Sequence, residues 1–120
     1  NPLTDNDMTN LAEEVPTGPI ITLTYRVKAE RRQDLIDFLR SAISVYEEPG
    51  GIRIALYECF DEPGLFCELI AYSSQETYLA DQVRVDEDER MRKVLSEWHA
   101  LFDGPLEVRR MQVIDLRSKT

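Results

Sequence analysis

The stretch EEPGGIRIALYECFDEPGLFCELIAY, residues 47–72, decides the fold of this chain. It opens with a Pro-Gly-Gly break and holds a second Pro-Gly turn at residues 63–64, between two runs rich in aliphatic and aromatic side chains. Turn residues placed between two such runs are typical of a β-hairpin. The stretch therefore predicts one strand from about Ile52 to Phe60 and a second strand that ends at Tyr72.

The segments before the hairpin predict a strand and a helix. Residues 20–27 alternate between apolar and mixed side chains, which is the pattern of a half-buried strand. Residues 30–46 change to a helical period with one apolar stripe. We expect residues 49–51 to end this helix, because proline cannot continue the hydrogen-bond ladder and glycine adopts the left-handed cap.

Two helices and a last strand are expected after the hairpin. A short helix is predicted over residues 75–82, and the acidic run of residues 86–89 opens a longer one with Asp86 as its cap. A cation site is the less favoured interpretation of this acidic run. The apolar pattern of residues 106–116 predicts the last strand, with a bulge at Arg109-Arg110 where the alternation slips.

The order of these elements is β-α-β-β-α-β. It predicts a ferredoxin-like α+β fold, a four-stranded antiparallel sheet with the helices on one face. We expect this domain over residues 19–118, after an N-terminal tail of residues 1–18. The second sheet face also carries aromatic and aliphatic side chains, so we expect a homodimer that packs through this open face as a dimeric α+β barrel.

Composition limits the class of partner. The 120 residues, 42% of them hydrophobic, suit one small domain. The formal charge of −9 repels nucleic-acid phosphates and anionic lipid, so neither nucleic acid nor a membrane is an expected partner. No apolar run is long enough to span a bilayer, and the first residues carry no signal-peptide pattern, so a cytoplasmic location is expected.

Cysteine and histidine usage argues against a metal site. Cys59 and Cys67 lie on the two arms of the hairpin, and two buried free thiols are favoured over a cross-strand disulfide. The chain has one histidine, His99, and no zinc-ligand spacing. It also lacks a glycine-rich phosphate loop and a serine-centred triad, so neither metal nor cofactor is expected.

From about residue 20 to residue 116, the sequence resembles the dimeric α+β-barrel superfamily of the antibiotic biosynthesis monooxygenase type. The resemblance lies in the order and spacing of four segments, TYRVKAERRQDLIDFL, EPGGIRIALYECFDEPGLF, AYSSQETYLADQ and LFDGPLEVRRMQVI. It implies a dimer with a ligand cleft in each subunit. Members include cofactor-free monooxygenases that act on aromatic polyketides, haem-degrading enzymes and isomerases.

The chain departs from the family at its best-known positions. Many members show an acidic residue, a spacer and an aromatic residue, followed some nine residues later by a histidine. The corresponding residues here are Ile70, Tyr72 and Asp81, so the resemblance does not imply a histidine-dependent mechanism. Thr22 and Thr24 stand where haem-degrading members use asparagine, so haem degradation is not implied either.

Three residues are candidate catalytic groups. Asp81 and His99 are candidate proton acceptors, and Tyr72 is a candidate phenol at the site. A packing or surface role is favoured over a catalytic one for His99, and a structural role is favoured for Tyr72. Glu68 is either a carboxylate in the cleft or a cross-strand partner of Arg53, and the second role is favoured.

Aromatic and basic residues are the candidate ligand contacts. Aromatic walls and a cation suit a ligand that carries a delocalised negative charge. Arg53 or Arg26 could hold such an anion. The predicted substrate-binding residues are Tyr25, Arg53, Tyr57 and Trp98, although a structural role is favoured for the three aromatic ones.

The predicted function is the binding of a small aromatic or hydrophobic molecule, with cofactor-independent oxygenase activity as the enzymatic hypothesis. A deprotonated aromatic substrate reacts with dioxygen itself, so the protein needs only to orient it, hold its anion and exclude water. The alternative, from a different class, is a non-catalytic dimer with a ligand-binding or structural role, whose cleft its own side chains fill.

Overall fold

The described part of the chain folds into one sheet with its helices on one side. The computed structural model describes residues 17–117. The predicted tail of residues 1–18 lies outside the described residues apart from Thr17 and Gly18, as does residue 118 at the predicted end of the domain. The elements are β1 (Ile20–Arg26), the 3-10 turn η1 (Ala29–Arg31), α2 (Arg32–Tyr46), β2 (Ile52–Glu58), β3 (Leu65–Tyr72), α3 (Gln75–Glu87), α4 (Glu89–His99) and β4 (Asp103–Met111).

The sheet is antiparallel with strand order β2-β3-β1-β4, so the predicted ferredoxin-like fold is confirmed. The first and third strands occupy the centre, as the split order requires. Glu68 of β3 pairs with Leu23 of β1 and with Leu56 of β2. A carboxylate therefore lies in the middle of the sheet.

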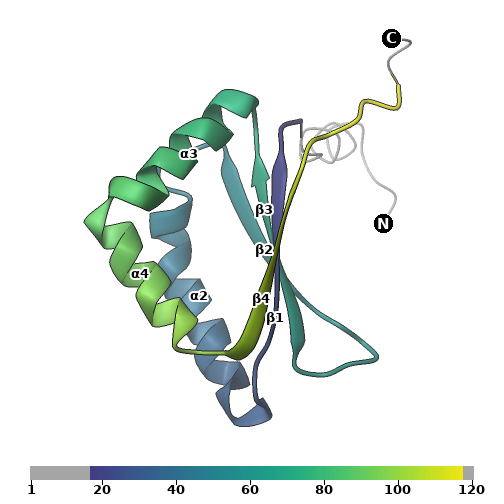
Figure 1. The fold of residues 1–120 in the computed structure, drawn as a ribbon, viewed down its shortest axis with the longest axis vertical. Coiled ribbons are helices and arrows are strands. Elements are labelled where there is room, and N and C mark those ends of the chain that lie inside the picture. The colour runs from purple at the N-terminus through teal and green to yellow at the C-terminus, as the bar shows by residue number, and fades with distance from the viewer. Residues whose placement is uncertain (1–16, 118–120) are drawn as a thin grey trace, which may run out of the picture.

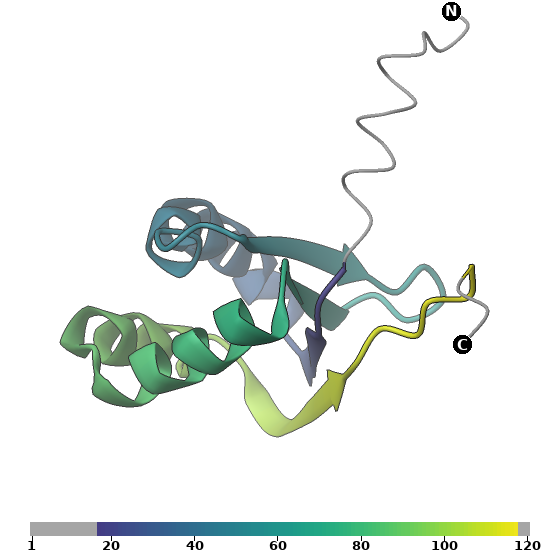
Figure 2. The same ribbon diagram turned by 90° about the horizontal axis from the view of Figure 1, so that it is seen from above.

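The helices form the second layer. Figures 1 and 2 show α2, α3 and α4 against the same face of the sheet, with the opposite face open. The main core lies between the layers, where Tyr25, Leu35, Phe66 and Trp98 are buried together. No helix within residues 17–117 is long and apolar enough to cross a membrane.

Glycine ends the first helical segment as predicted. Gly50 and Gly51 have φ angles of 81° and 73°, in the left-handed region that other residues rarely adopt. A Cβ atom on Gly51 would also lie 2.5 Å from the hydroxyl oxygen of Ser73. The chain thus turns closely from α2 into β2.

The acidic run caps a helix, but the cap is Asp88 and not the predicted Asp86. The carboxylate of Asp88 accepts hydrogen bonds from the backbone N–H groups of Arg90 (2.8 Å) and Met91 (3.4 Å). The first of the two helices continues to Glu87, which moves the break between α3 and α4 to Asp88. Within residues 17–117, no cluster of three or more His, Cys, Asp or Glu side chains could hold a metal ion.

The last strand is shorter than predicted, and its irregularity lies near its start instead of at Arg109-Arg110. Its pairing with β1 shifts between Asp103 and Glu107, beside Pro105, which cannot donate to the ladder. The predicted bulge at Arg109-Arg110 is therefore wrong, since both arginines pair in regular register. Beyond Met111 the described chain leaves the sheet and exposes Val113, Ile114 and Leu116.

The two cysteines are free thiols, as predicted. Cys67 is half-buried on β3, but Cys59 lies just beyond the end of β2 and is exposed. The prediction of burial is therefore wrong for Cys59.

Candidate functional site

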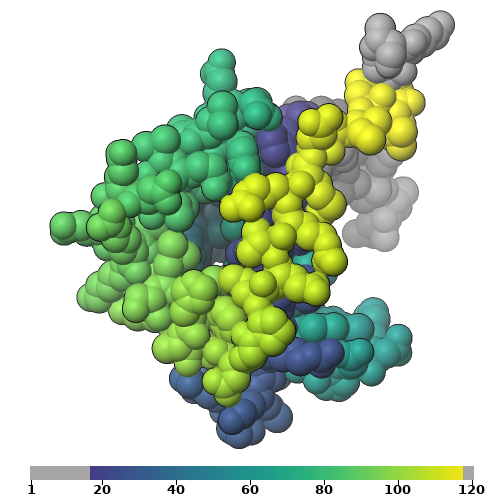
Figure 3. Space-filling model, in the orientation of Figure 1, coloured from purple at the N-terminus to yellow at the C-terminus, as the bar shows by residue number. Residues whose placement is uncertain are grey.

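A cavity of about 310 Å³ lies between the sheet and the helices. Figure 3 shows the surface hollowed between the α3–α4 segment and β4. A cavity of this size with mostly apolar walls is typical of a small-molecule site. The apolar lining comes from both layers and consists of Ile21, Leu23, Ile52, Ile54, Ile70, Val85, Met91, Leu95 and Val108.

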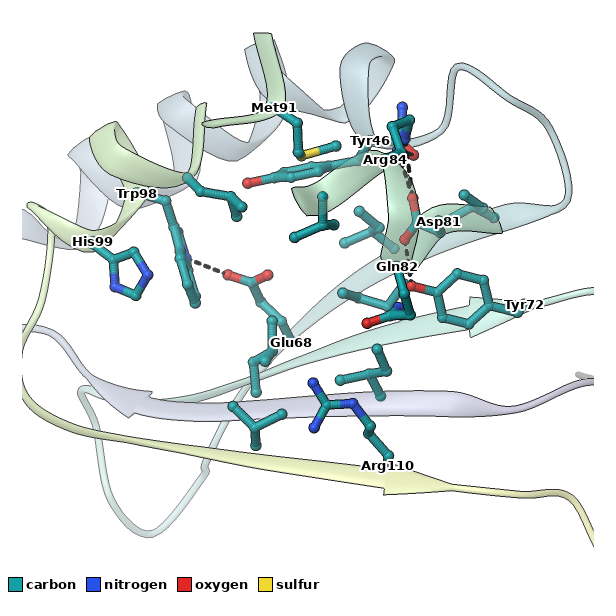
Figure 4. Close-up of a pocket in the computed structure, with 18 residues that line it drawn as sticks. Tyr46, Glu68, Tyr72, Asp81, Gln82, Arg84, Met91, Trp98, His99 and Arg110 are labelled. Atoms are coloured by element: carbon teal, nitrogen blue, oxygen red, sulfur yellow. Dashed lines mark hydrogen bonds and ion pairs between the residues drawn. The ribbon is translucent and has the colours of Figure 1, made fainter. Parts of the chain in front are cut away.

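A carboxylate is buried in the wall of this cavity. Glu68 is 2% exposed, and two donors converge on its Oε1 atom. The Tyr25 hydroxyl donates to Oε1 at 2.5 Å, and the Trp98 indole N–H donates at 2.7 Å (Figure 4). Burial raises the pKa of Glu68, and these two hydrogen bonds oppose part of that rise.

The phenols next to Glu68 are held in their neutral form. Burial, followed by the charge of Glu68, raises the pKa of Tyr25 and that of Tyr46. The Tyr25 ring packs against Phe102 at a centroid distance of 4.6 Å and meets Trp98 edge-on at 5.4 Å. Tyr25 therefore serves as a fixed hydrogen-bond donor that orients the carboxylate.

The favoured sequence interpretation of Glu68, as a partner of Arg53, is wrong. Arg53 pairs with Ala71 across the β2–β3 ladder, while Glu68 pairs with Leu56. Arg53 therefore points to the open face and Glu68 points to the helices. The other interpretation, a carboxylate in the cleft, describes what the structure shows.

A second polar group closes the α3 side of the cavity. The Tyr72 hydroxyl donates to Asp81 Oδ2 at 2.5 Å, and Arg84 Nη2 donates to Oδ1 at 2.9 Å. The same guanidinium donates to the backbone carbonyls of Val45 and Tyr46, both at 2.6 Å, at the end of α2. Asp81 and Arg84 together thus link β3, α3 and the end of α2.

Burial, and next the hydrogen bond to Asp81, raises the pKa of Tyr72. The Tyr72 phenol is therefore kept protonated as a donor. Asp81 and Tyr72, two of the three predicted catalytic residues, lie together in the cavity wall and bond to each other.

The third, His99, lies at the edge of the cavity near the end of α4. Its ring is exposed and packs against Trp98 at 4.8 Å and Phe102 at 5.7 Å. Figure 4 shows the indole of Trp98 standing between His99 and Glu68. His99 is thus separated from the other candidate catalytic residues.

The predicted substrate-binding residues divide between the two sheet faces. Trp98 lines the cavity, and Tyr25 lies directly behind Glu68. Tyr57, which is 58% exposed, and Arg53 lie on the open face because they alternate with the inward-facing residues of β2. The structure therefore brings Tyr25 and Trp98 together and leaves Arg53 and Tyr57 on the far side of the sheet.

Sequence reasoning missed Arg110, a cation that lines this cavity on the β4 side. Arg110 pairs with Ile21 of β1 and faces the cavity from the edge strand, with its guanidinium on the Glu68 side in Figure 4. Strict alternation from Leu106 and Val108 would have placed it on this face, but the expected bulge obscured that signal. Among residues 17–117, Arg110 forms no side-chain hydrogen bond or ion pair. Arg26, the other suggested cation, pairs instead with Glu62.

The fold and the site together define a ferredoxin-like α+β protein with an apolar cavity between its sheet and its helices. No protein-family model matches the sequence, and no curated protein matches it significantly. Solved structures, however, share the fold at low sequence identity.

A putative antibiotic biosynthesis monooxygenase from Deinococcus radiodurans is 13% identical, with a TM-score of 0.65, over 85% of this chain and 98% of that one. SnoaB, a cofactor-independent oxygenase from Streptomyces nogalater, is 7% identical, with a TM-score of 0.61, over 86% and 97%. A dimeric ferredoxin-like protein from an uncultured marine organism is 14% identical, with a TM-score of 0.63, over 87% and 94%. The resemblance to the antibiotic biosynthesis monooxygenase type is thus confirmed in the fold.

Proposed function

We propose that this protein binds a small aromatic or hydrophobic molecule in the cavity and acts on it as a cofactor-independent oxygenase. The observation that carries the proposal is a cavity of about 310 Å³ with largely apolar walls, in which the buried carboxylate of Glu68 and the guanidinium of Arg110 form no ion pair within residues 17–117. Apolar walls suit a hydrophobic ring system, and the two polar groups suit an acidic ligand oxygen. The fold shared with SnoaB, described as a cofactor-independent oxygenase, supports the same proposal.

In the proposed reaction, the deprotonated substrate itself reacts with dioxygen, and the protein supplies no redox group. The bound molecule loses a proton, and its conjugate base reduces dioxygen. One oxygen atom forms a new carbonyl on the substrate, and the other leaves as water with the two hydrogen atoms of the oxidised carbon. The protein orients the ring, stabilises the negative charge and excludes water.

The predicted catalytic groups of this proposal are Asp81 and Tyr72 in the cavity wall and His99 at its rim. Trp98 is the residue predicted to contact the ring of the substrate. Arg110 replaces Arg53 as the proposed anion-binding residue, because Arg110 faces the cavity and Arg53 does not.

The test uses anthrone, a three-ring ketone with an acidic C–H group. Trp98 is the single tryptophan and lines the cavity, so anaerobic quenching of its emission reports binding directly. Oxygen uptake and anthraquinone formation in air then report turnover. We expect Ile70→Phe, which fills part of the cavity, to weaken both signals, and Leu79→Phe, an exposed change on α3, to leave them unchanged. An absence of quenching in the wild-type protein would contradict the proposed site.

One observation favours a non-catalytic ligand-binding role as the second candidate. Asp81 stands where many family members have histidine, and its carboxylate is already occupied by Tyr72 and Arg84. The same experiment separates the two functions, because a purely binding protein would quench with anthrone and show no oxygen uptake above buffer. The version of this alternative in which the protein fills its own cleft is disfavoured, since the cavity is open.

We also propose that two copies associate through the open sheet face. Tyr57 is largely exposed there, and Leu69 alternates with the inward-facing Glu68 and Ile70 on the central strand β3. Burial of this apolar area would stabilise a pair of sheets packed face to face. The structural neighbour described as a dimeric ferredoxin-like protein supports this arrangement.

A further inference from the structure

The two oxygen atoms of Glu68 have different surroundings. The Trp98 indole can only donate, so Oε1 must act as the acceptor of its N–H group. Tyr25 donates to the same oxygen. Oε1 therefore carries no proton, and any proton on Glu68 resides on Oε2.

The second oxygen faces the cavity. In Figure 4, Oε1 points to Trp98, while Oε2 points away from the indole into the space between sheet and helices. Within residues 17–117 no buried side-chain polar atom lacks a partner, and Oε2 has no hydrogen bond, so Oε2 is accessible from the cavity. A ligand in the cavity would meet this atom.

We propose that Glu68 accepts the acidic proton of the bound ligand on Oε2, while Arg110 holds the resulting oxyanion. This inference rests on the proposed ligand site and names its substrate class: a phenol, or the keto form of one, that ionises to an aromatic oxyanion. The ligand's O–H or C–H bond breaks, an O–H bond forms on Oε2, and the negative charge passes from the carboxylate to the ligand oxygen. No electron acceptor is needed for this step.

Charge and burial suit this role. A carboxylate with a raised pKa is a stronger base than a solvated one, and its basicity lies closer to that of a phenolate. Arg110 supplies the positive charge that the anion requires, with no described partner to neutralise it. Asp81, by contrast, uses both of its oxygen atoms in bonds to Tyr72 and Arg84.

Several other groups surround Glu68 and bear on its titration. Tyr25 from β1, Tyr46 from α2 and Trp98 from α4 are neutral at physiological pH, and only Tyr25 and Trp98 donate to its carboxylate. β2 contributes the apolar side chains of Ile52, Ile54 and Leu56 on this face, and Glu58 at its end pairs with Arg32 of α2. The remaining polar or charged groups that line the same cavity are Tyr72, Asp81, Gln82 and Arg84 on the α3 side, His99 of α4 and Arg110 of β4.

The test measures proton transfer without oxygenation. Anthrone is incubated anaerobically with the protein in D₂O, and the exchange of its acidic hydrogen is followed by NMR or mass spectrometry. For the wild-type protein we expect exchange above the buffer rate, with a rate that rises as Glu68 ionises and becomes constant above its pKa, which lies above the ordinary value of 4.5.

We expect Glu68→Gln to lower the protein-dependent rate by about 100-fold or more and to abolish the pH step, a typical size for loss of a general base. Trp98 quenching should show that this variant still binds anthrone, since the amide oxygen can accept the same two hydrogen bonds. Glu107→Gln removes the same charge from an exposed residue of β4 and should leave rate and pH profile unchanged. Arg110→Gln should lower the rate and keep the step.

Several results would overturn the inference. Exchange that persists at the wild-type rate in Glu68→Gln contradicts it, as does exchange that is lost in His99→Gln or Asp81→Asn and kept in Glu68→Gln. The wild-type pH profile tests the same point without any substitution, because a rate with no step above 4.5 excludes a buried carboxylate base. Binding without exchange removes the role of Glu68 and leaves the ligand site intact, whereas an absence of binding removes both.

Discussion

Tyr25→Phe is the sharpest test of the buried hydrogen-bond cluster. The substitution removes only the hydroxyl that donates to Glu68 and keeps the ring packed against Phe102 and Trp98. Glu68 then loses one of its two donors in a site where water cannot fully replace it. We therefore expect a lower free energy of unfolding with no change of fold.

The size of the effect depends on pH, and its sign follows from the charge of Glu68. A hydrogen bond between neutral groups contributes about 1 kcal/mol, and one to a carboxylate contributes about 2 kcal/mol. Tyr25→Phe should thus cost about 1 kcal/mol at pH 4, below the ordinary carboxyl pKa of 4.5, and the cost should rise towards about 2 kcal/mol as the pH passes through the raised pKa of Glu68. Each kcal/mol corresponds to a fall of about 4–8 °C in Tm for a domain of this size.

The same variant should change the pH dependence of stability. Burial raises the folded-state pKa of Glu68, so its contribution to stability is fully present below 4.5 and is lost as pH rises through the raised pKa. The Tyr25 hydrogen bond lowers that pKa, so its removal raises the pKa further. In Tyr25→Phe this loss of stability should therefore extend to higher pH.

The assay is urea unfolding at pH 4 and pH 8, followed by circular dichroism. Tyr57→Phe is the matched control, because this tyrosine is 58% exposed and makes no described side-chain hydrogen bond, and it should change stability by less than about 0.5 kcal/mol. A Tyr25→Phe protein that matches this control at both pH values, or that loses more stability at pH 4 than at pH 8, would refute the reasoning about Glu68.

Three further predictions concern the frame of the site. Arg84→Met should cost about 3 kcal/mol in urea unfolding, because it removes the cation paired with the buried Asp81 carboxylate and the side-chain donor to two backbone carbonyls, and a cost below about 1 kcal/mol would contradict this. Asp88→Ala should lower the Tm more than Asp86→Ala does, since only Asp88 caps α4; equal effects would contradict that assignment. Sedimentation should show a wild-type dimer, a Leu69→Asp monomer and an unchanged Leu79→Asp dimer, whereas a wild-type monomer at micromolar concentration would contradict the proposed interface.

Much of the fold could be predicted because local patterns determine it. Glycine is needed at positions 50 and 51 because the backbone has a positive φ there. Alternation in residues 52–58 assigns each side chain to one of the two faces of the sheet. The sequence predicted an aspartate cap for α4, but it indicated Asp86 where the structure has Asp88. Asp86 and Asp88 are both acceptable caps by sequence, and the packing of α3 decides where that helix ends.

The candidate site could be predicted only in part. Alternation places Glu68 on the same face of β3 as Phe66, Ile70 and Tyr72. It does not determine which residues of β2 lie beside Glu68 on that face, because this depends on the register between the two strands. The role of Arg110 was missed for a related reason. A bulge at Arg109-Arg110, as expected from the sequence, would have moved every later side chain to the opposite face, whereas both arginines pair in regular register.

The order of the elements, the turns and the two faces of each strand follow from the sequence, because backbone conformation and burial periodicity are local properties. Which faces pack against each other depends on long-range contacts between the strands and the helices. The register of β2 and β3 places Arg53 and Glu68 on opposite faces of the sheet. The packing of α4 on the sheet brings the Trp98 indole into hydrogen-bonding contact with Glu68. A buried carboxylate acquires its donors and its basicity from residues distant in the chain, so this chemistry exists only after the layers have packed.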